Sequence, residues 1–72
     1  MGKALFHHHV ASRRERARAA TIDEIKETAQ RLMREQGTTE VRFSDIAREM
    51  GMTAPALYRY FADRDELLSS IA

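Results

Sequence analysis

Apolar residues recur at helical spacing along most of this sequence, and glycines interrupt the pattern at two places. Spacing of three or four residues puts apolar side chains on one face of a helix, which must be buried against other helices. Glycine readily adopts the left-handed conformation that ends a helix. The sequence shows no strand pattern, no internal repeat and no second domain. It predicts helices over residues 22–36, 43–50 and 54–61, and a last one from about Arg64 to the end.

The first helix has two candidate starting points. Ser12 with Glu15, and Thr21 with Glu24, both match the capping box, in which a hydroxyl accepts from the amide three positions on. The second box agrees with a helix from about residue 22, whereas the first would extend that helix back to residue 12. We divide the chain into a flexible basic N-terminal arm, residues 1–20, and a helical domain, residues 21–72.

Length and composition restrict the class of protein. A chain of 72 residues holds one small domain with a small core, and without cysteine no disulfide can stabilise it. No apolar run approaches the roughly 18 residues of a membrane-spanning helix. We therefore expect a soluble cytoplasmic protein, without a membrane partner, that melts readily.

A metal site and an enzyme are both disfavoured. The three consecutive histidines His7, His8 and His9 lie in a leader without periodicity, where such a run is usually tag-like or incidental. The carboxylates fall at helix caps or on solvated helix faces. Nothing assembles the positioned acid, base and stabiliser that catalysis requires. We predict no metal, no cofactor and no enzymatic activity.

The charge is distributed unevenly along the chain. The first twenty residues hold five basic residues and one acidic residue, a net charge of +4, while the rest hold seven basic and ten acidic residues, a net charge of −3. A basic arm on a mildly acidic body suggests a polyanion partner reached through local patches, although a solvated tail is an equal alternative. The arm residues that would contact such a partner are Arg13, Arg14, Arg16 and Arg18.

Only the residues GMT separate the second predicted helix from the third. Gly51 is placed at the bend, and the apolar Met52 can fold inward. Thr53 is a good N-cap, and Pro55 lies within the first turn, where it breaks no internal hydrogen bond. This is the layout of a helix-turn-helix, whose second helix enters the major groove of DNA.

A helical wheel of residues 54–61 separates a buried side from an exposed one. Leu57 and Phe61 define the buried stripe, Pro55, Ala56 and Arg59 point outward, and Tyr58 and Tyr60 lie on the two flanks. Small side chains allow close approach to bases, and tyrosine hydroxyls can bond phosphates on the groove walls. Packing of both tyrosines on neighbouring helices is the alternative. Arg64 suits a phosphate, or else a local ion pair with Asp63, Asp65 or Glu66.

The segment from Ile25 to Leu68 resembles the N-terminal DNA-binding domain of the tetracycline-repressor-like (TetR) family of bacterial transcription regulators. The resemblance is carried by Ile25, Ala29, Leu32, Met33 and Gly37, and by the run DIAREMGMTAPALYRYFADRDELL from Asp45 to Leu68. It implies an all-α fold, a homeodomain-like three-helix helix-turn-helix domain followed by the start of a fourth helix. It also implies binding to a double-stranded DNA operator, as a repressor.

The resemblance also assigns roles to individual residues. The positions that face bases or adjoining phosphates are Thr53, Ala54, Pro55, Ala56 and Tyr58. Tyr60 stands where the family usually has a phosphate-binding histidine, and Arg64 where it has a phosphate-binding lysine. Because Tyr60 cannot become cationic, its contact should depend less on salt. Arg42 replaces a threonine that often caps the second helix, and it could add a phosphate contact.

Members of this family normally continue into a helical domain that binds a small-molecule inducer and forms a homodimer. We expect that domain to be missing from the 72 residues, so that neither property belongs to this segment. The alternative to a DNA-binding head is a helical module that binds another protein through the face of residues 54–61.

Overall fold

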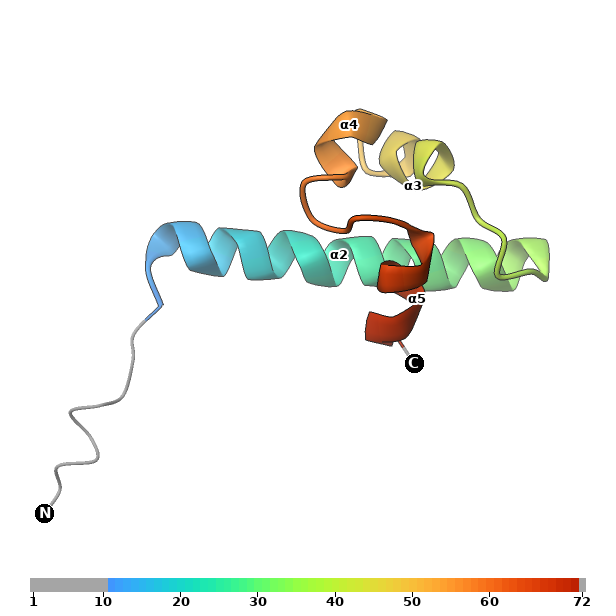
Figure 1. The fold of residues 1–72 in the computed structure, drawn as a ribbon, viewed down its shortest axis with the longest axis horizontal. Coiled ribbons are helices and arrows are strands. Elements are labelled where there is room, and N and C mark those ends of the chain that lie inside the picture. The colour runs from blue at the N-terminus through green and yellow to red at the C-terminus, as the bar shows by residue number, and fades with distance from the viewer. Residues whose placement is uncertain (1–10, 72) are drawn as a thin grey trace, which may run out of the picture.

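The computed structural model describes residues 11–71, which form four α-helices and no strand. Figure 1 shows α2 as a long rod, with α3 and α4 on one side of it and α5 crossing it. The helices are α2 (Arg13–Gln36), α3 (Phe43–Glu49), α4 (Ala54–Leu57) and α5 (Arg64–Ile71). The all-α prediction is confirmed, and each predicted helix is present.

Helix α2 begins at the earlier of the two candidate positions. The Ser12 hydroxyl accepts from the Glu15 amide at 3.1 Å, and the Glu15 carboxylate accepts from the Ser12 amide at 2.8 Å, which completes the capping box. Thr21 lies within the helix, where its hydroxyl donates to the carbonyl of Ala17 at 3.0 Å. Residues 13–20, which the sequence placed in the arm, are helical, and residues 1–10 lie outside the described residues.

Both glycines end helices in the way that the pattern predicted. Gly37 has a φ of 68° and donates its amide to the carbonyl of Met33 at 2.8 Å, which closes α2. Gly51 has a φ of 70° and follows directly on Met50, the C-cap of α3. At the other end of α3, the N-cap Arg42 makes no side-chain capping bond, so this helix begins without the usual hydroxyl.

Helix α4 is shorter than predicted. Thr53 caps it, accepting from the Ala56 amide at 3.3 Å, and it ends at Leu57 instead of Phe61. The Tyr58 amide still donates to the carbonyl four residues back, but the amides of Arg59 and Tyr60 donate to carbonyls three residues back, at 3.2 and 2.9 Å. The backbone thus tightens into a turn at this point, because bonds to the third residue back wind the chain more closely than bonds to the fourth.

Helix α5 begins at Arg64, as predicted. The Asp63 carboxylate accepts from the amide of Glu66 at 2.8 Å, and the Glu66 carboxylate accepts from the amide of Ala62 at 3.0 Å. The predicted capping box is thus present in a modified form, in which Glu66 reaches one residue further back than the cap. These bonds fix the chain between the turn after α4 and the start of α5.

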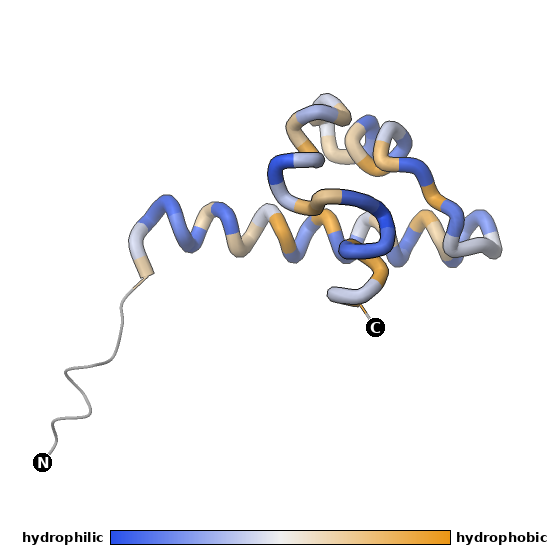
Figure 2. Tube along the Cα trace, in the orientation of Figure 1, coloured by the Kyte–Doolittle hydropathy of each residue, from blue (hydrophilic) through white to orange (hydrophobic). Residues whose placement is uncertain are grey.

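The core lies where α3, α4 and α5 meet the middle and end of α2, and hydrophobic residues of these helices appear in orange in Figure 2. The first turns of α2 protrude beyond this core, since every residue from 12 to 20 is exposed. No helix among the described residues is long and apolar enough to cross a membrane. The buried residues are Ile25, Ala29, Leu32, Val41, Phe43, Ile46, Ala47, Leu57, Phe61 and Leu67.

Candidate nucleic-acid interface

The link between α3 and α4 is a tight turn held from inside. The Met52 amide donates to the carbonyl of Ala47 at 2.8 Å, and the Met52 side chain packs against the core, as predicted. Gly51 lies at the bend in the left-handed conformation, which costs glycine little. This turn holds α3 and α4 in direct contact as a helix-turn-helix.

The outer surface of α4 is formed by small residues. Leu57 is fully buried and Phe61 nearly so, as the wheel predicted, and Thr53, Pro55 and Arg59 are exposed. Two of the residues predicted to read bases, Ala54 and Ala56, are half-buried. The wheel had placed Ala56 further outward; in the short helix it lies partly covered. A low surface remains at the N-terminal end of α4, without any bulky side chain before Tyr58.

The two tyrosines differ in exposure. Tyr58 is 54% exposed and is the one exposed large hydrophobic residue among those described. Tyr60 is half-buried and packs against the core. The Tyr60 hydroxyl makes no hydrogen bond with residues 11–71. Every buried side-chain oxygen or nitrogen among these residues does have a hydrogen-bond partner, which means that the Tyr60 hydroxyl is not buried. The Tyr60 hydroxyl therefore reaches solvent, and both phenol groups are accessible from outside.

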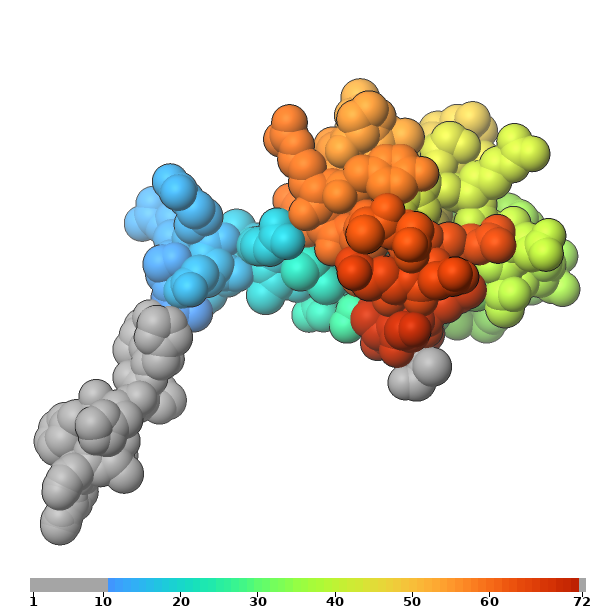
Figure 3. All heavy atoms as spheres, in the orientation of Figure 1, coloured from blue at the N-terminus to red at the C-terminus, as the bar shows by residue number. Residues whose placement is uncertain are grey.

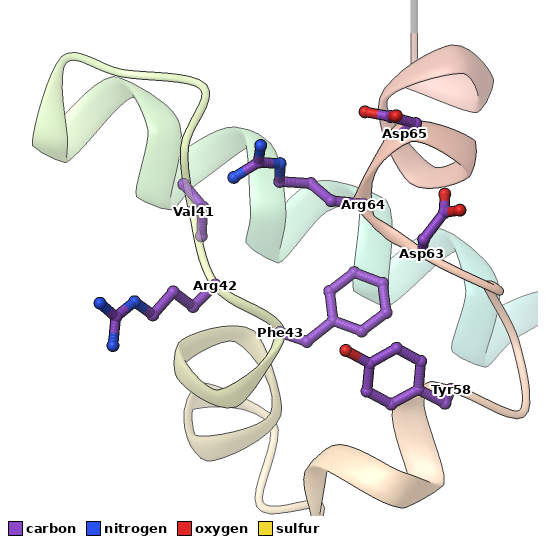
Figure 4. A pocket seen from close by; sticks show the side chains of 7 residues that line it. All are labelled: Val41, Arg42, Phe43, Tyr58, Asp63, Arg64 and Asp65. Atoms are coloured by element: carbon purple, nitrogen blue, oxygen red, sulfur yellow. The ribbon is translucent and has the colours of Figure 1, made fainter.

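Three of the residues predicted to bind phosphate line one hollow. Arg42 before α3, Tyr58 after α4 and Arg64 at the start of α5 surround it, together with Val41, Phe43 and two aspartates. In Figure 4 the ring of Tyr58 lies beside Phe43, and the side chains of Arg42 and Arg64 extend on the side of Val41. The fold thus brings together donors from three segments, which lie before α3, after α4 and at the start of α5.

The local ion pairs considered for Arg64 do not form within the described residues. Neither Arg64 nor Arg42 has its guanidinium group in an ion pair or hydrogen bond with any residue of 11–71. Asp63 instead caps α5, and Figure 4 shows its carboxylate on the other side of the chain from the Arg64 guanidinium group. Two aspartates, Asp63 and Asp65, still lower the local positive potential.

The arginines predicted to lie in an arm have different positions on α2. Arg13 and Arg14 are exposed, and Arg16 donates to the carbonyl of Ala11. Arg18 reaches across to the turn after α4. Its guanidinium carbon lies 4.8 Å from the centroid of the Tyr60 ring, and its Nη2 donates to the carbonyl of Arg59 at 3.4 Å. In Figure 3 the orange atoms of this turn adjoin the cyan part of α2, beyond its blue start.

Sequence reasoning did not find the contact between Arg18 and Tyr60. The residues are separated by about forty positions, and the flexible arm that was predicted would have no fixed place. The one available signal was the Ser12 capping box. A helix that begins there includes Arg18 and gives this residue a fixed position along the helix axis.

A separate set of charges connects α2 with the end of α3. Arg31 donates to Glu49 at 2.8 Å and to Glu35 at 3.3 Å. The hydrogen bond with Glu49, followed by that with Glu35, raises the pKa of Arg31 above its ordinary value. One guanidinium group between two carboxylates leaves a net charge of −1, so this side of the molecule is less suited to a polyanion than the side of Arg42 and Arg64.

The sequence disfavoured a metal site at the three consecutive histidines. His7, His8 and His9 lie outside the described residues. Among residues 11–71 there is no group of three histidine, cysteine or acidic side chains that could hold a metal ion.

Comparison with known proteins assigns the chain to a family. The family model described as "Bacterial regulatory proteins, tetR family" matches residues 25–71, which is more than half of the chain. Neither the curated proteins nor the solved structures compared with it gave a match. The matched region contains α3 and α4 in full, and the family is one of DNA-binding regulators and not of enzymes. The chain therefore belongs to the tetR family of bacterial regulatory proteins, and α3 and α4 form the helix-turn-helix through which it binds DNA in the regulation of transcription.

Proposed function

We propose that this chain is the sequence-specific reading head of a bacterial repressor, and that α4 enters the major groove of its operator. The observation that carries the proposal is the hollow lined by Arg42, Tyr58 and Arg64 beside the low surface of α4. The two guanidinium groups have no partner in residues 11–71, so phosphates can bind them without breaking an existing ion pair.

The bases are read by the N-terminal half of α4 in this proposal. Thr53 and Pro55 are exposed, and Ala54 and Ala56 let the backbone come close to the base edges. A proline ring, an alanine methyl and a threonine methyl are all suited to contact with a thymine methyl. The Thr53 hydroxyl accepts from the Ala56 amide, which leaves its methyl as the part available for such a contact.

The phosphates are held on both sides of the base contacts. Arg42, Tyr58 and Arg64 bind them on the side of the hollow, and Tyr60 binds on the other flank of α4. The protruding turns of α2, residues 13–20, add the exposed residues Arg13 and Arg14, with Arg16 and Arg18 on the same turns. A single head of this size buries roughly 600 to 1,000 Å² of its own surface on DNA.

A second head on the same operator increases the affinity in this proposal. Two-fold symmetric regulators bind half-sites one helical turn apart or a multiple of that. The homodimer and the small-molecule inducer implied by the family resemblance are predictions that residues 11–71 do not test. Because bacterial DNA lies in the cytoplasm, the proposal places the regulator there.

A salt titration tests the phosphate contacts. A duplex is first selected from a random DNA pool with the 72-residue chain, and its affinity is then measured between 50 and 200 mM salt. Each phosphate neutralised by a cation contributes about −0.9 to the slope of log affinity against log salt. Arg42→Gln and Arg64→Gln should each make the slope shallower by about this amount.

The matched control is Arg34→Gln, which removes the same charge from the last turn of α2. It should leave the slope nearly unchanged. The proposal fails if no duplex is enriched in the selection, or if all three variants give the same slope as the unsubstituted chain. Pro55→Ala tests base reading separately, because it should lower the preference for the selected duplex over a scrambled one without changing the slope.

A further inference from the structure

Tyr60 stands where the family resemblance implies a histidine, which could become cationic. In the structure the guanidinium group of Arg18 lies over the Tyr60 ring. The guanidinium carbon of Arg18 lies 4.8 Å from the Tyr60 ring centroid, within the range of a cation–π contact. The same guanidinium group donates to the carbonyl of Arg59 at 3.4 Å, which holds it over the turn that carries Tyr60. The cation that lies over the Tyr60 ring is therefore supplied by α2.

Both groups remain available to a ligand. Arg18 is exposed and makes no ion pair with any residue of 11–71, and the Tyr60 hydroxyl reaches solvent without a partner there. The carbonyl of Arg59 and the face of an aromatic ring satisfy only part of a guanidinium group, which has five N–H donors. The remaining donors can bind an anion that approaches the hydroxyl.

We propose that Arg18 and Tyr60 bind one DNA phosphate together, with the guanidinium group supplying the charge and the phenol hydroxyl a hydrogen bond. This inference rests on the proposed function and deepens it at one contact. It also changes the expectation for Tyr60, whose contact was predicted to depend less on salt because tyrosine cannot become cationic. With Arg18 beside it, the contact gains the salt dependence of a cation.

The arrangement gives the start of α2 a defined role. Residues 13–20 are all exposed, and among them Arg18 contacts the turn after α4 through its guanidinium group. Ser12 and Glu15 cap the helix that carries Arg18, so the capping box helps to position the Arg18 guanidinium group against the turn that carries Tyr60.

The test compares Arg18→Gln with Tyr60→Phe on the duplex selected from a random pool. Arg18→Gln should make the salt slope shallower by about 0.9, so that its loss of affinity at 50 mM salt exceeds that at 200 mM by about three- to four-fold. Tyr60→Phe keeps the ring under Arg18 and removes only the hydroxyl. It should weaken binding by a similar factor at every salt concentration, with the slope unchanged. Arg18→Lys keeps the charge and should keep the slope.

Arg34→Gln is the matched control, because Arg34 is on the same helix, 16 residues further on and about 24 Å away along its axis. Melting of each variant shows whether it is folded at the temperature of the binding measurement. A folded Arg18→Gln variant with an unchanged slope would overturn the joint contact, even if its affinity falls, because a purely structural role changes affinity without removing a neutralised phosphate. Enrichment of a duplex together with that result leaves the proposed function intact, whereas no enrichment at all contradicts both.

Discussion

The ring of Tyr58 packs against the ring of Phe43, with centroids 4.7 Å apart and planes tilted by 47°. Phe43 is the first residue of α3 and is 7% exposed, while Tyr58 follows α4 and is 54% exposed. A buried ring from one helix of the helix-turn-helix therefore supports an exposed ring next to the other. The support connects the core directly to a residue that we place on DNA.

Phe43→Leu should lower the affinity for the selected duplex although Phe43 itself is buried. The substitution removes an aromatic pair worth about 0.5–1.5 kcal/mol beyond its buried area and releases the Tyr58 ring. In a Tyr58→Leu background the same substitution should have little further effect on DNA affinity, because the supported ring is already gone. Binding isotherms of the four proteins measure this coupling, and additive losses would show that Phe43 does not act through Tyr58.

Ser12→Ala should loosen the start of α2 without unfolding the domain. Loss of an N-cap hydroxyl costs about 0.5–2 kcal/mol, and here only exposed turns depend on it. Amide hydrogen exchange should accelerate for the first turns of α2 and stay unchanged in the core. Melting should shift little. An unchanged exchange rate in these turns, or a large loss of global stability, would contradict this role of the capping box.

Gly51→Ala should destabilise the domain by about 1–2 kcal/mol, because alanine at a φ of 70° is strained. A Cβ at this position meets no atom within 4 Å, so steric clash adds nothing to that cost. Gly37→Ala is the matched control, with a φ of 68° and equally open surroundings, and it should cost a similar amount.

Asparagine at either position should cost less, since it tolerates the left-handed conformation better than alanine. Chemical denaturation measures all four variants. A loss from Gly51→Ala much larger than the loss from Gly37→Ala would show that the turn of the helix-turn-helix depends on more than its backbone conformation.

Local patterns in the sequence were sufficient to predict the helices and most of the core. Ile25, Ala29 and Leu32 are buried on one stripe of α2, and Leu57 and Phe61 are buried as the wheel indicated. These predictions hold because periodicity and capping depend on residues three or four apart. The end of α4 could not be predicted in the same way. Phe61 is buried whether the backbone remains helical or tightens into a turn, so its apolar character does not distinguish the two.

Contacts between segments that are distant in the sequence could not be predicted from local patterns. The packing of Tyr58 on Phe43, and of Arg18 on Tyr60, depends on how α2, α3 and α4 cross. A wheel of residues 54–61 gave the two tyrosines equivalent flanks, whereas in the structure Tyr60 packs against the core and Tyr58 is exposed. The choice between Ser12 and Thr21 as the start of α2 was open because both boxes have the same local chemistry.

The most direct test is a titration of the ¹⁵N-labelled chain with the selected duplex, in which the NMR chemical shifts of the backbone amides are monitored. We predict the largest changes at Arg42, at residues 53–60 and at Arg64, and small changes around Arg31, whose partners are Glu35 and Glu49. Large shifts around Arg31 and Glu49, with residues 53–60 unmoved, would contradict the placement of α4 in the groove.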